Sequence, residues 1–555
     1  MAEIVTGPGR KRAILWIMLA LTALLYVINF QVNDIWTENE SFYAESAREM
    51  SEQGNFLDIN YNYEPRFNKP PLTYWMITAS TALFGQSELA VRLPTVILAF
   101  ATTLLVWRMA LMLYDEKTAL LAFAMQAISI QFIAGKQYAS PEIPLAFFFT
   151  LTLYLFLKGH LEGKSIYYRL SAVALGLSVL TKGYPYIIVI LGIIVLFLSF
   201  EAEFRPAELF RKVMELKPFS FILIASVIGL SWVIMMYLRY GDGFLAVLNR
   251  ETIERALSRE SNGWRDLLFY PEVSLWSFFP YSLVFVYALF CSIFKIRSIR
   301  EITFAFSWLV VMLSIFTAAK GKIPTYFIQA HPALALISAS FVSRYSPRSR
   351  FSATIWNLTF ILPTVAGIVL STAIIILFQL SPLYHLITGA LLLLIATGWL
   401  PGEGWAEERS TIRALQPFMA TFGALLIFSA GVLPQLEEHR PMDSIGRAIN
   451  LERRIPKKIP LYVQDSLPLN LPYYAERKVI SEAIPAELLG KQGPILALLQ
   501  SKDLPDSIGT SVIWKGEIYR RRTSESRLLL FIESHLKARK GNMSGFTNYS
   551  LVYRK

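Results

Sequence analysis

The sequence has little cysteine, histidine and charge for its length. It contains one cysteine and five histidines in 555 residues, so it can form no intrachain disulfide and offers no Cys/His cluster of the kind that binds zinc. Charged residues make up only 17% of the chain. No P-loop or dinucleotide-binding motif is present. We therefore expect neither a disulfide-rich secreted protein nor an ATP-dependent or nucleotide-sugar enzyme.

Hydrophobic residues are abundant instead, at 54% of the chain, and the mean hydropathy is +0.43. Segments of about 20 residues with almost no charge recur, each long enough to cross a hydrocarbon core about 30 Å thick. Helices satisfy their own backbone in that solvent. We predict a polytopic α-helical membrane protein with about thirteen transmembrane helices. The predicted spans lie near residues 13–31, 89–113, 117–134, 140–158, 166–181, 184–200, 218–238, 273–294, 302–319, 325–343, 353–379, 383–400 and 414–433.

The cations of the short loops predict the orientation. Arg10, Lys11 and Arg12 precede the first span, so we expect a cytoplasmic N-terminus and an uncleaved anchor. An odd number of spans then turns the first loop and the C-terminal tail outward. The net charge of +12 follows from this topology and from anionic lipid headgroups rather than from nucleic-acid binding. The predicted inner loops carry Lys158, Lys164, Arg169, Arg211, Lys212, Lys217, Lys295, Arg297, Arg300, Arg344, Arg348 and Arg350.

The composition changes near residue 435, and this change predicts two domains. Residues 1–435 form the membrane part, and residues 436–555 are expected to form a small soluble α/β domain, large enough to own a core. Within it we predict strands at 460–463, 511–514 and 549–553, and helical stretches within 486–500 and at 526–537.

The first outward loop, about residues 32–88, is charged and aromatic at once. Glu40–Gln53 has helical spacing and Gly54 is a suitable stop. A second helix is expected to begin near Pro70-Pro71 and to run towards Leu83. Both are amphipathic and are expected to lie along the membrane surface. A long loop of this composition, among short connections, favours a functional site over a linker.

Carboxylates stand at the start of this loop. Glu38 or Glu40, on either side of Asn39, could take a proton from a hydroxyl nucleophile. Thr37-x-x-Glu40 is also a capping-box pattern, in which Glu40 bonds the backbone at the helix start instead. The spacing alone leaves both interpretations open.

Cations gather on the predicted outer face. Lys69, which follows Arg66 and precedes two prolines, is held by a stiff turn, and its point charge suits a phosphate. A snorkelling surface lysine is the alternative. Charges near the bilayer core cost about 2.5–3.5 kcal/mol each, so such positions usually have a role. We therefore predict an outer cationic pocket for a lipid-linked phosphate. Its further candidates are Lys136 with Glu142, Lys182, Lys320, Lys322, and Arg250, Arg255 and Arg259 of the second long outward loop.

Three motifs resemble the polyprenyl-phosphate-dependent glycosyltransferases of the GT-C superfamily. The lipid A 4-amino-4-deoxy-L-arabinose transferases are the more similar members, and the protein O-mannosyltransferases are more distant. Weaker similarity continues through Thr181-Lys182-Gly183 and the 320–332 segment into the C-terminal domain. The motifs are Glu40-x-x-Tyr43-Ala44-Glu45-x-Ala47-Arg48-Glu49-Met50, Glu64-Pro65-Arg66-Phe67-Asn68-Lys69-Pro70-Pro71-Leu72-x-Tyr74-Trp75 and Phe84-Gly85-x-Ser87-Glu88-x-x-x-Arg92-Leu93-Pro94.

The resemblance implies a bacterial inner-membrane enzyme with a GT-C-like fold. It would move a sugar from undecaprenyl phosphate or a similar carrier to a lipid A-like lipid, a glycan or a protein on the periplasmic side. It would act by single displacement, with inversion at the anomeric carbon. A transporter or flippase of polyprenyl-linked lipids that uses the same cations is the alternative, although the chain shows no paired inverted halves.

The resemblance also implies residue roles. The family's acidic pair falls on Asn39 and Glu40, its second carboxylate on Glu142, and its phosphate-binding lysine on Lys69. Tyr326 and an arginine, Arg255, would contact the phosphate, and Tyr43 of the first motif would lie beside the substrate. Asn39 stands where the family usually has Asp, so Glu38 or Glu40 would be the base. Asn68 replaces a glutamate that contributes to a metal site in the lipid A enzymes, so no metal ligands are predicted and a divalent cation is not indicated.

Overall fold

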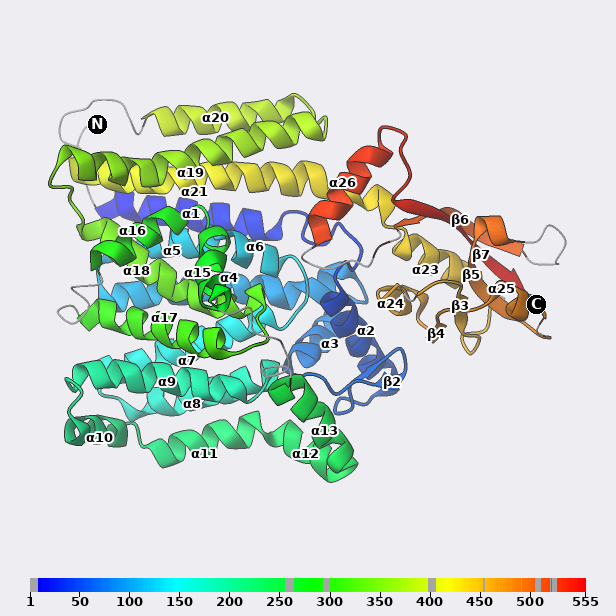
Figure 1. Ribbon diagram of the computed structural model, residues 1–555, viewed down its shortest axis with the longest axis horizontal. Coiled ribbons are helices and arrows are strands. Elements are labelled where there is room, and N and C mark those ends of the chain that lie inside the picture. Colours follow the sequence, from blue (N-terminus) through cyan, green and yellow to red (C-terminus); the bar gives the residue numbers. More distant parts are fainter. Residues whose placement is uncertain are drawn as a thin grey trace.

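A bundle of long helices with a small sheet at one end makes up the protein. The computed structural model describes residues 8–254, 264–292, 300–397, 406–452, 455–466, 468–490, 492–504, 511–519, 521 and 527–555. The bundle helices run side by side along the longest axis, and the sheet with its own helices lies beyond one end of them (Figure 1). The bundle consists of α1 (Pro8–Val27), α4 (Glu88–Leu113), α5 (Glu116–Ile128), α6 (Ile130–Lys136), α7 (Glu142–Glu162), α8 (Ser165–Lys182), α9 (Pro185–Glu201), α10 (Pro206–Glu215), α11 (Pro218–Gly229), α12 (Ser231–Tyr240), α13 (Asp242–Asn249), the π-helical turn η2 (Arg250–Glu254), α15 (Arg265–Ser277), α16 (Ser282–Ser292), α17 (Arg300–Ala318), the 3₁₀ helix η4 (Pro324–Ala330), α18 (His331–Arg344), α19 (Arg350–Leu377), α20 (Leu383–Thr397), α21 (Ala406–Ile427), η5 (Phe428–Val432), α22 (Leu433–Leu436) and η6 (Glu437–His439).

Several of these helices have the length and apolarity of membrane spans. Among the described residues, five helices meet both criteria, and the total reaches seven if each of two bent pairs counts as one span. The bends are 58° between α5 and α6 and 49° between α11 and α12. Five shorter helices are also apolar. The helical membrane architecture is therefore confirmed, whereas the number of about thirteen spans stays a prediction.

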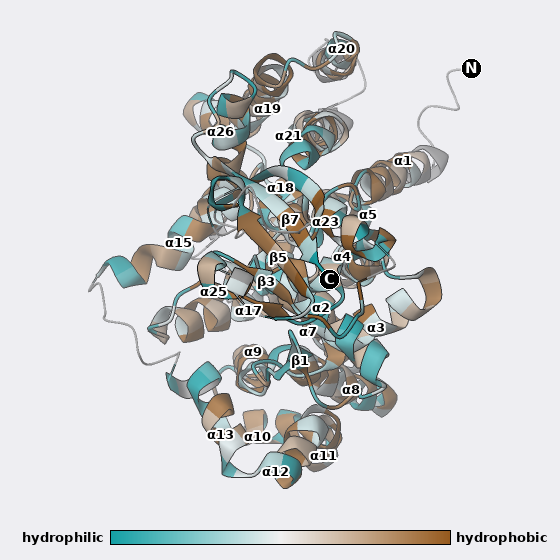
Figure 2. Ribbon diagram, turned by 90° about the vertical axis from the view of Figure 1, so that its right-hand side faces the viewer, coloured by the Kyte–Doolittle hydropathy of each residue, from teal (hydrophilic) through white to brown (hydrophobic). Residues whose placement is uncertain are grey.

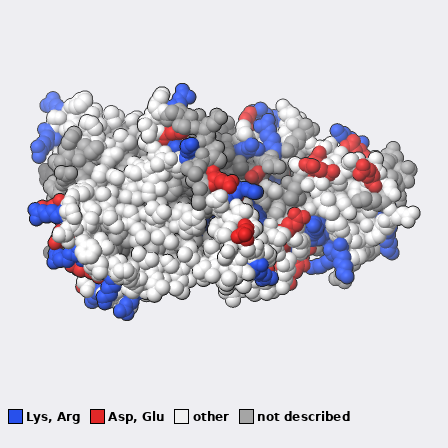
Figure 3. All heavy atoms as spheres, turned by 60° about the horizontal axis from the view of Figure 1, so that its bottom comes forward, with Lys and Arg blue, Asp and Glu red and all other residues white. Residues whose placement is uncertain are grey.

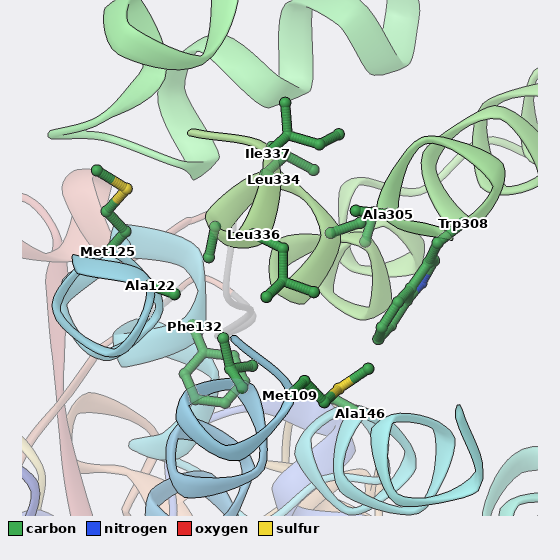
Figure 4. Packing of buried hydrophobic residues seen from close by; sticks show 14 of the residues in the cluster. Met109, Ala122, Met125, Phe132, Ala146, Ala305, Trp308, Leu334, Leu336 and Ile337 are labelled. Carbon is green, nitrogen blue, oxygen red and sulfur yellow. The ribbon is translucent and has the colours of Figure 1, made fainter. Parts of the chain in front are cut away.

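The interior of the bundle is packed with apolar side chains from helices distant in sequence. Trp308 of α17 stacks on Phe149 of α7 with ring centroids 5.6 Å apart, and Met109, Ala146 and Leu336 approach the same region (Figure 4). Small residues bring backbones close, as expected between membrane helices. At Gly367 of α19, an added Cβ would lie 2.9 Å from the backbone of Ala420 in α21.

Charged side chains are unevenly distributed along the long axis. Figure 3 shows a broad face of the bundle with few Lys, Arg, Asp or Glu side chains, between a mostly cationic end and a sheet end that carries both signs. Such a belt is what a hydrocarbon layer would cover, and the excess of cations at one end has the form of the positive-inside pattern.

The first loop folds at the sheet end of the bundle. It contains α2 (Glu38–Gln53), the two-residue strands β1 (Asn60–Tyr61) and β2 (Glu64–Pro65), and α3 (Leu72–Phe84). Thr37 caps α2, since its hydroxyl accepts from the Glu40 N–H at 3.0 Å, and α2 ends at Gly54 with φ +64°. Both predicted helices are thus confirmed. Most residues of α2 from Glu40 to Met50 are buried beneath neighbouring elements of the protein, and the position of both helices along a membrane surface stays a prediction.

The residues after the bundle form a mixed five-stranded sheet with short helices, here called the sheet region (442–555). Strand order is β4-β3-β5-β7-β6, with β4, β3 and β5 parallel and β7 antiparallel to both β5 and β6. The helix predicted at 526–537 is confirmed as α26. Helical stretches were predicted within 486–500: α25 (Pro485–Gly490) confirms one, whereas residues 495–500 form the buried central strand β5. The elements are α23 (Met442–Leu451), β3 (Leu461–Val463), α24 (Leu471–Ala475), β4 (Val479–Ile480), α25 (Pro485–Gly490), β5 (Ile495–Gln500), η7 (Ser501–Asp503), β6 (Ser511–Tyr519), α26 (Leu528–Ala538) and β7 (Phe546–Arg554).

The sheet region is hydrogen-bonded to the first loop. The Tyr474 hydroxyl accepts from the Ile35 N–H and donates to Glu88, at 2.7 Å in both cases. The Asn62 side chain exchanges two hydrogen bonds with the backbone of Val479, at 2.7 and 2.8 Å. Viewed from this end, the sheet lies over the middle of the bundle, with α12 and α13 to one side (Figure 2). The sheet region therefore holds the first loop in place over the bundle end.

A second junction joins α26 to the end of the bundle. His535 of α26 is fully buried, and its Nδ1 lies 3.1 Å from Nδ1 of His439 in η6. The Arg539 guanidinium donates to the backbone oxygen of Phe378, which follows α19, at 3.0 Å.

Candidate functional site

A cavity of about 240 Å³ lies where the first loop meets the ends of the bundle helices. Three of the predicted site residues, Lys69, Lys182 and Tyr326, line it. Local sequence places each one: Lys69 precedes the two prolines that start α3, Lys182 ends α8 before Gly183, and Tyr326 lies in the η4 turn. The remaining wall is mostly apolar and includes Phe67, Val179, Tyr186, Val189, Trp232, Val233, Leu248, Ile315 and Phe316.

Lys182 is held against this cavity by a buried ion pair. Its Nζ lies 2.9 Å from Oε1 of Glu142, and the two side chains are only 7% and 8% exposed. The same ammonium lies 5.0 Å from the centroid of the Tyr326 ring, a cation–π contact. The other carboxylate oxygen of Glu142 is buried without a hydrogen-bond partner among the described residues. The attraction between the two opposite charges offsets part of the cost of removing both from water.

Lys69 meets an acidic side chain that the sequence did not indicate. Its Nζ lies 3.2 Å from Oε2 of Glu251, in the π-helical turn η2. The amide of Asn68 donates to the other oxygen of Glu251 at 3.3 Å. Glu251 also lines the cavity. The Asn68 side chain is thus hydrogen-bonded to η2.

Arg66 and Tyr43 lie behind the cavity rather than on its wall. The Arg66 guanidinium stacks over the ring of Phe42 at 3.7 Å. Tyr43 is buried and its ring stacks on Tyr74 at a centroid distance of 4.3 Å. Tyr43 thus packs α2 against α3, and Arg66 packs the segment before α3 against α2.

Glu40 is engaged by four donors and is fully buried. Arg92 of α4 contributes Nε at 2.6 Å and Nη2 at 3.0 Å, and the backbone N–H groups of Trp36 and Ala139 donate at 2.9 and 3.1 Å. Of the two interpretations left open by the spacing, this geometry favours the structural one. The Glu40 side chain bonds the N–H of Trp36 rather than that of Thr37, so the capping box is a variant of the usual form.

The other two candidates at the start of α2 differ in exposure. Asn39 is exposed. Glu38 is half-buried and lines a separate cavity of about 120 Å³ between the first loop and the sheet region, together with Arg440 and Asp465.

Of the remaining predicted cations, the four that the structure describes (Lys136, Arg250, Lys320 and Lys322) are not among the residues that line the Lys69 cavity. Lys136 is buried and donates to the backbone oxygens of Leu25 and Tyr26 at 3.3 and 3.1 Å, so it caps the C-terminal end of α1. Lys322 donates to the oxygen of Ala319 at 2.7 Å, and Lys320 is exposed. Arg255 and Arg259 lie outside the described residues. Within the described ranges no group of three or more His, Cys, Asp or Glu side chains is placed to hold a metal ion.

The chain is similar to several known proteins. Residues 68–237 match a family model described as dolichyl-phosphate-mannose-protein mannosyltransferase. An uncharacterized protein of Aquifex aeolicus (strain VF5) is 32% identical over 92% of this chain and 94% of its own length. An undecaprenyl phosphate-alpha-4-amino-4-deoxy-L-arabinose arabinosyl transferase of Pectobacterium carotovorum (strain PC1) is 27% identical, over 60% of each chain. The alignment thus spans less than two thirds of that transferase.

The fold has a solved counterpart. The crystal structure of ArnT from Cupriavidus metallidurans bound to undecaprenyl phosphate superposes with a TM-score of 0.72 at 18% identity, covering 92% of this chain and 97% of the other. The transporter alternative is not favoured by these matches. From the motifs, the family model and the fold together, the chain belongs to the GT-C superfamily of polyprenyl-phosphate-dependent glycosyltransferases, in which it resembles the lipid A 4-amino-4-deoxy-L-arabinose transferases.

Proposed function

We propose that this protein transfers a sugar from a polyprenyl-phosphate carrier to an acceptor at the outer face of a bacterial inner membrane. The observation that carries the proposal is the convergence of Lys69, Lys182 and Tyr326, from three distant segments, on one cavity with apolar walls. A cavity that joins ammonium and phenol groups to an apolar lining suits the phosphate of a lipid.

In the proposed reaction the donor phosphate binds to Lys69 and the Tyr326 hydroxyl. An acceptor oxygen attacks the anomeric carbon, and the bond from that carbon to the phosphate oxygen breaks with its electron pair passing to the phosphate. Lys69 and Tyr326 then stabilise the charge that grows on the leaving group, an oxyanion-type electrostatic role. Attack opposite the leaving group inverts the anomeric centre.

The acceptor proton needs a base near this cavity. We assign it to Glu142, because one of its oxygens holds Lys182 at the cavity wall and the other has no hydrogen-bond partner among the described residues. Glu40 is committed to Arg92, and Glu38 lines a different cavity. Asn39 cannot take a proton, so its proposed part is to orient the acceptor by hydrogen bonding.

Substitution of Lys69 tests the phosphate assignment. Lys69→Ala should reduce transfer from undecaprenyl-phosphate-linked sugar at least 100-fold while leaving expression and melting temperature unchanged, since removal of one charge-stabilising group costs about 10²–10³ in rate. The matched control is Lys164→Ala, an exposed lysine on the predicted inner side that pairs with Glu162 at 2.9 Å. Turnover by Lys69→Ala close to that of the control would remove Lys69 from the reaction.

The sugar and the acceptor are defined by a separate experiment. We propose a lipid A-like lipid, a glycan or a protein as the acceptor class. Mass spectrometry of envelope lipids, glycans and proteins from a deletion strain should reveal one species that lacks a single sugar residue. The missing mass identifies the sugar, and complementation with the Lys69→Ala variant should fail to restore it.

A further inference from the structure

Glu251 is placed where a bound phosphate would have to interact. Of the described residues that line the cavity, Glu251 is the only acidic one. Both of its carboxylate oxygens face donors from consecutive residues, the Lys69 ammonium at 3.2 Å and the Asn68 amide at 3.3 Å. The Lys69 and Glu251 side chains are 22% and 20% exposed, so the pair is only partly screened by water. The Glu251 carboxylate therefore contacts Lys69 and Asn68 in the way that an anionic ligand would.

A donor phosphate requires the same ammonium. Two anions that share one partly buried ammonium repel each other, so phosphate binding must displace Glu251 or weaken its contact. Glu251 lies in a single π-helical turn after α13. Such turns are rare in proteins as a whole, and those that occur are often at functional sites. The turn is short, so a small change in it would withdraw the carboxylate.

The reaction changes the charge that competes with Glu251. A sugar-linked phosphodiester carries one negative charge, whereas the released polyprenyl phosphate carries about −1.5 to −2 at pH 7. Lys69 therefore attracts the product more strongly than the donor. We propose that Glu251 is an internal competitor for Lys69: it lowers the affinity of the site for both forms of the carrier, so that the more strongly attracted product can still leave. This inference rests on the proposed function and adds a step of product release to it.

Binding of the product without sugar tests this inference directly. Undecaprenyl phosphate is titrated into the purified full-length protein in lipid nanodiscs. Glu251→Gln should lower the dissociation constant about fivefold, since loss of a partly exposed competing ion pair corresponds to about 1 kcal/mol. Under multiple turnovers the same variant should show slower steady-state transfer than its first turnover, because product release limits it. Glu251→Ala should change the binding in the same direction.

Two controls make the result specific. Glu254→Gln changes an exposed carboxylate of the same turn, bonded to Asn249 at 3.2 Å, and should leave the dissociation constant unchanged. In a Lys69→Ala background, Glu251→Gln should have no further effect on binding, because the two residues act on one ammonium.

The outcomes separate this inference from the proposed function. Unchanged or weaker binding by both Glu251 variants, or equal tightening in the Lys69→Ala background, would overturn the competitor role alone. Normal binding and transfer by the Lys69→Ala single variant would overturn the proposed function as well.

Discussion

Replacement of Glu40 by Gln distinguishes a structural carboxylate from a catalytic one. Glu40 connects three parts of the chain: the start of α2, Arg92 of α4 and the segment at Ala139. Removal of one partner from a buried ion pair costs about 3–5 kcal/mol, because the remaining charge is left uncompensated. Glu40→Gln keeps the size of the side chain and removes the charge, so we expect a loss of stability in this range.

Substitution of Arg92 should reduce the stability of the protein more than Glu40→Gln does. Besides Glu40, its guanidinium donates to the backbone oxygens of Phe30, Asn33 and Asp34 at 2.7 to 3.1 Å. Asp34 O keeps a second donor, Arg440 Nη2 at 2.6 Å, so Arg92→Met leaves the oxygens of Phe30 and Asn33 without this donor, and each buried orphan adds about 1–3 kcal/mol. The predicted order of stability is therefore wild type, then Glu40→Gln, then Arg92→Met.

Intrinsic tryptophan fluorescence during heating in detergent measures this order as an apparent melting temperature. Glu38→Gln is the matched control, since Glu38 lies on the same helix, is half-buried and should change stability by less than about 1 kcal/mol. Transfer is then measured well below the lowest melting temperature. If Glu40→Gln melts like the control but has lost transfer, Glu40 acts in the chemistry and the structural interpretation fails.

The remaining predictions concern two packing contacts. Burial, and repulsion from His439 and Arg539, lower the pKa of His535 to about 4. Below the ordinary histidine pKa of about 6.5, the unfolded chain therefore binds more protons than the folded chain. The free energy of unfolding should fall by up to about 3 kcal/mol as the pH drops from 6.5 to 4. Melting temperatures across that range should show the loss in the wild type and in His385→Gln, an exposed control, and a smaller loss in His535→Phe. Gly367→Ala should destabilise the protein by about 1–3 kcal/mol, because the added Cβ would lie 2.9 Å from the backbone of Ala420. The control Gly389→Ala should not, because an added Cβ there has nothing within 4 Å. Equal melting temperatures for the two glycine variants would contradict this packing.

The local elements of the first loop could be predicted because their signals are local. Gly54 adopts the left-handed conformation that glycine favours, and two prolines precede α3. The strand β5 (495–500) was not predicted, since the range 486–500 was expected to contain helical stretches only. It lies between β3 and β7 with five of its six residues buried, and a strand covered on both faces loses the alternation that would identify it.

In the candidate site, too, only residues with local signals could be predicted from the sequence. Lys69, Lys182 and Tyr326 could be named from charge near the predicted bilayer surface and from the motifs. Their partners could not, since Glu251 follows Lys69 by 182 residues and Arg92 follows Glu40 by 52. Arg92 lies inside a predicted span, and an unpaired charge there was the available signal for a buried partner. Glu251 belongs to no motif, so only the folded chain identifies it.

The hydrogen bonds between the first loop and the sheet region have a consequence for biosynthesis. Ile35 and Tyr474 are separated by 439 positions, and Asn62 and Val479 by 417. A ribosome adds about 5–20 residues per second, so the loop waits tens of seconds or more after its own synthesis before these partners exist. During that interval the nascent chain is inserted but has an incomplete loop. These contacts between the loop and the sheet region can therefore form only after synthesis has passed Val479.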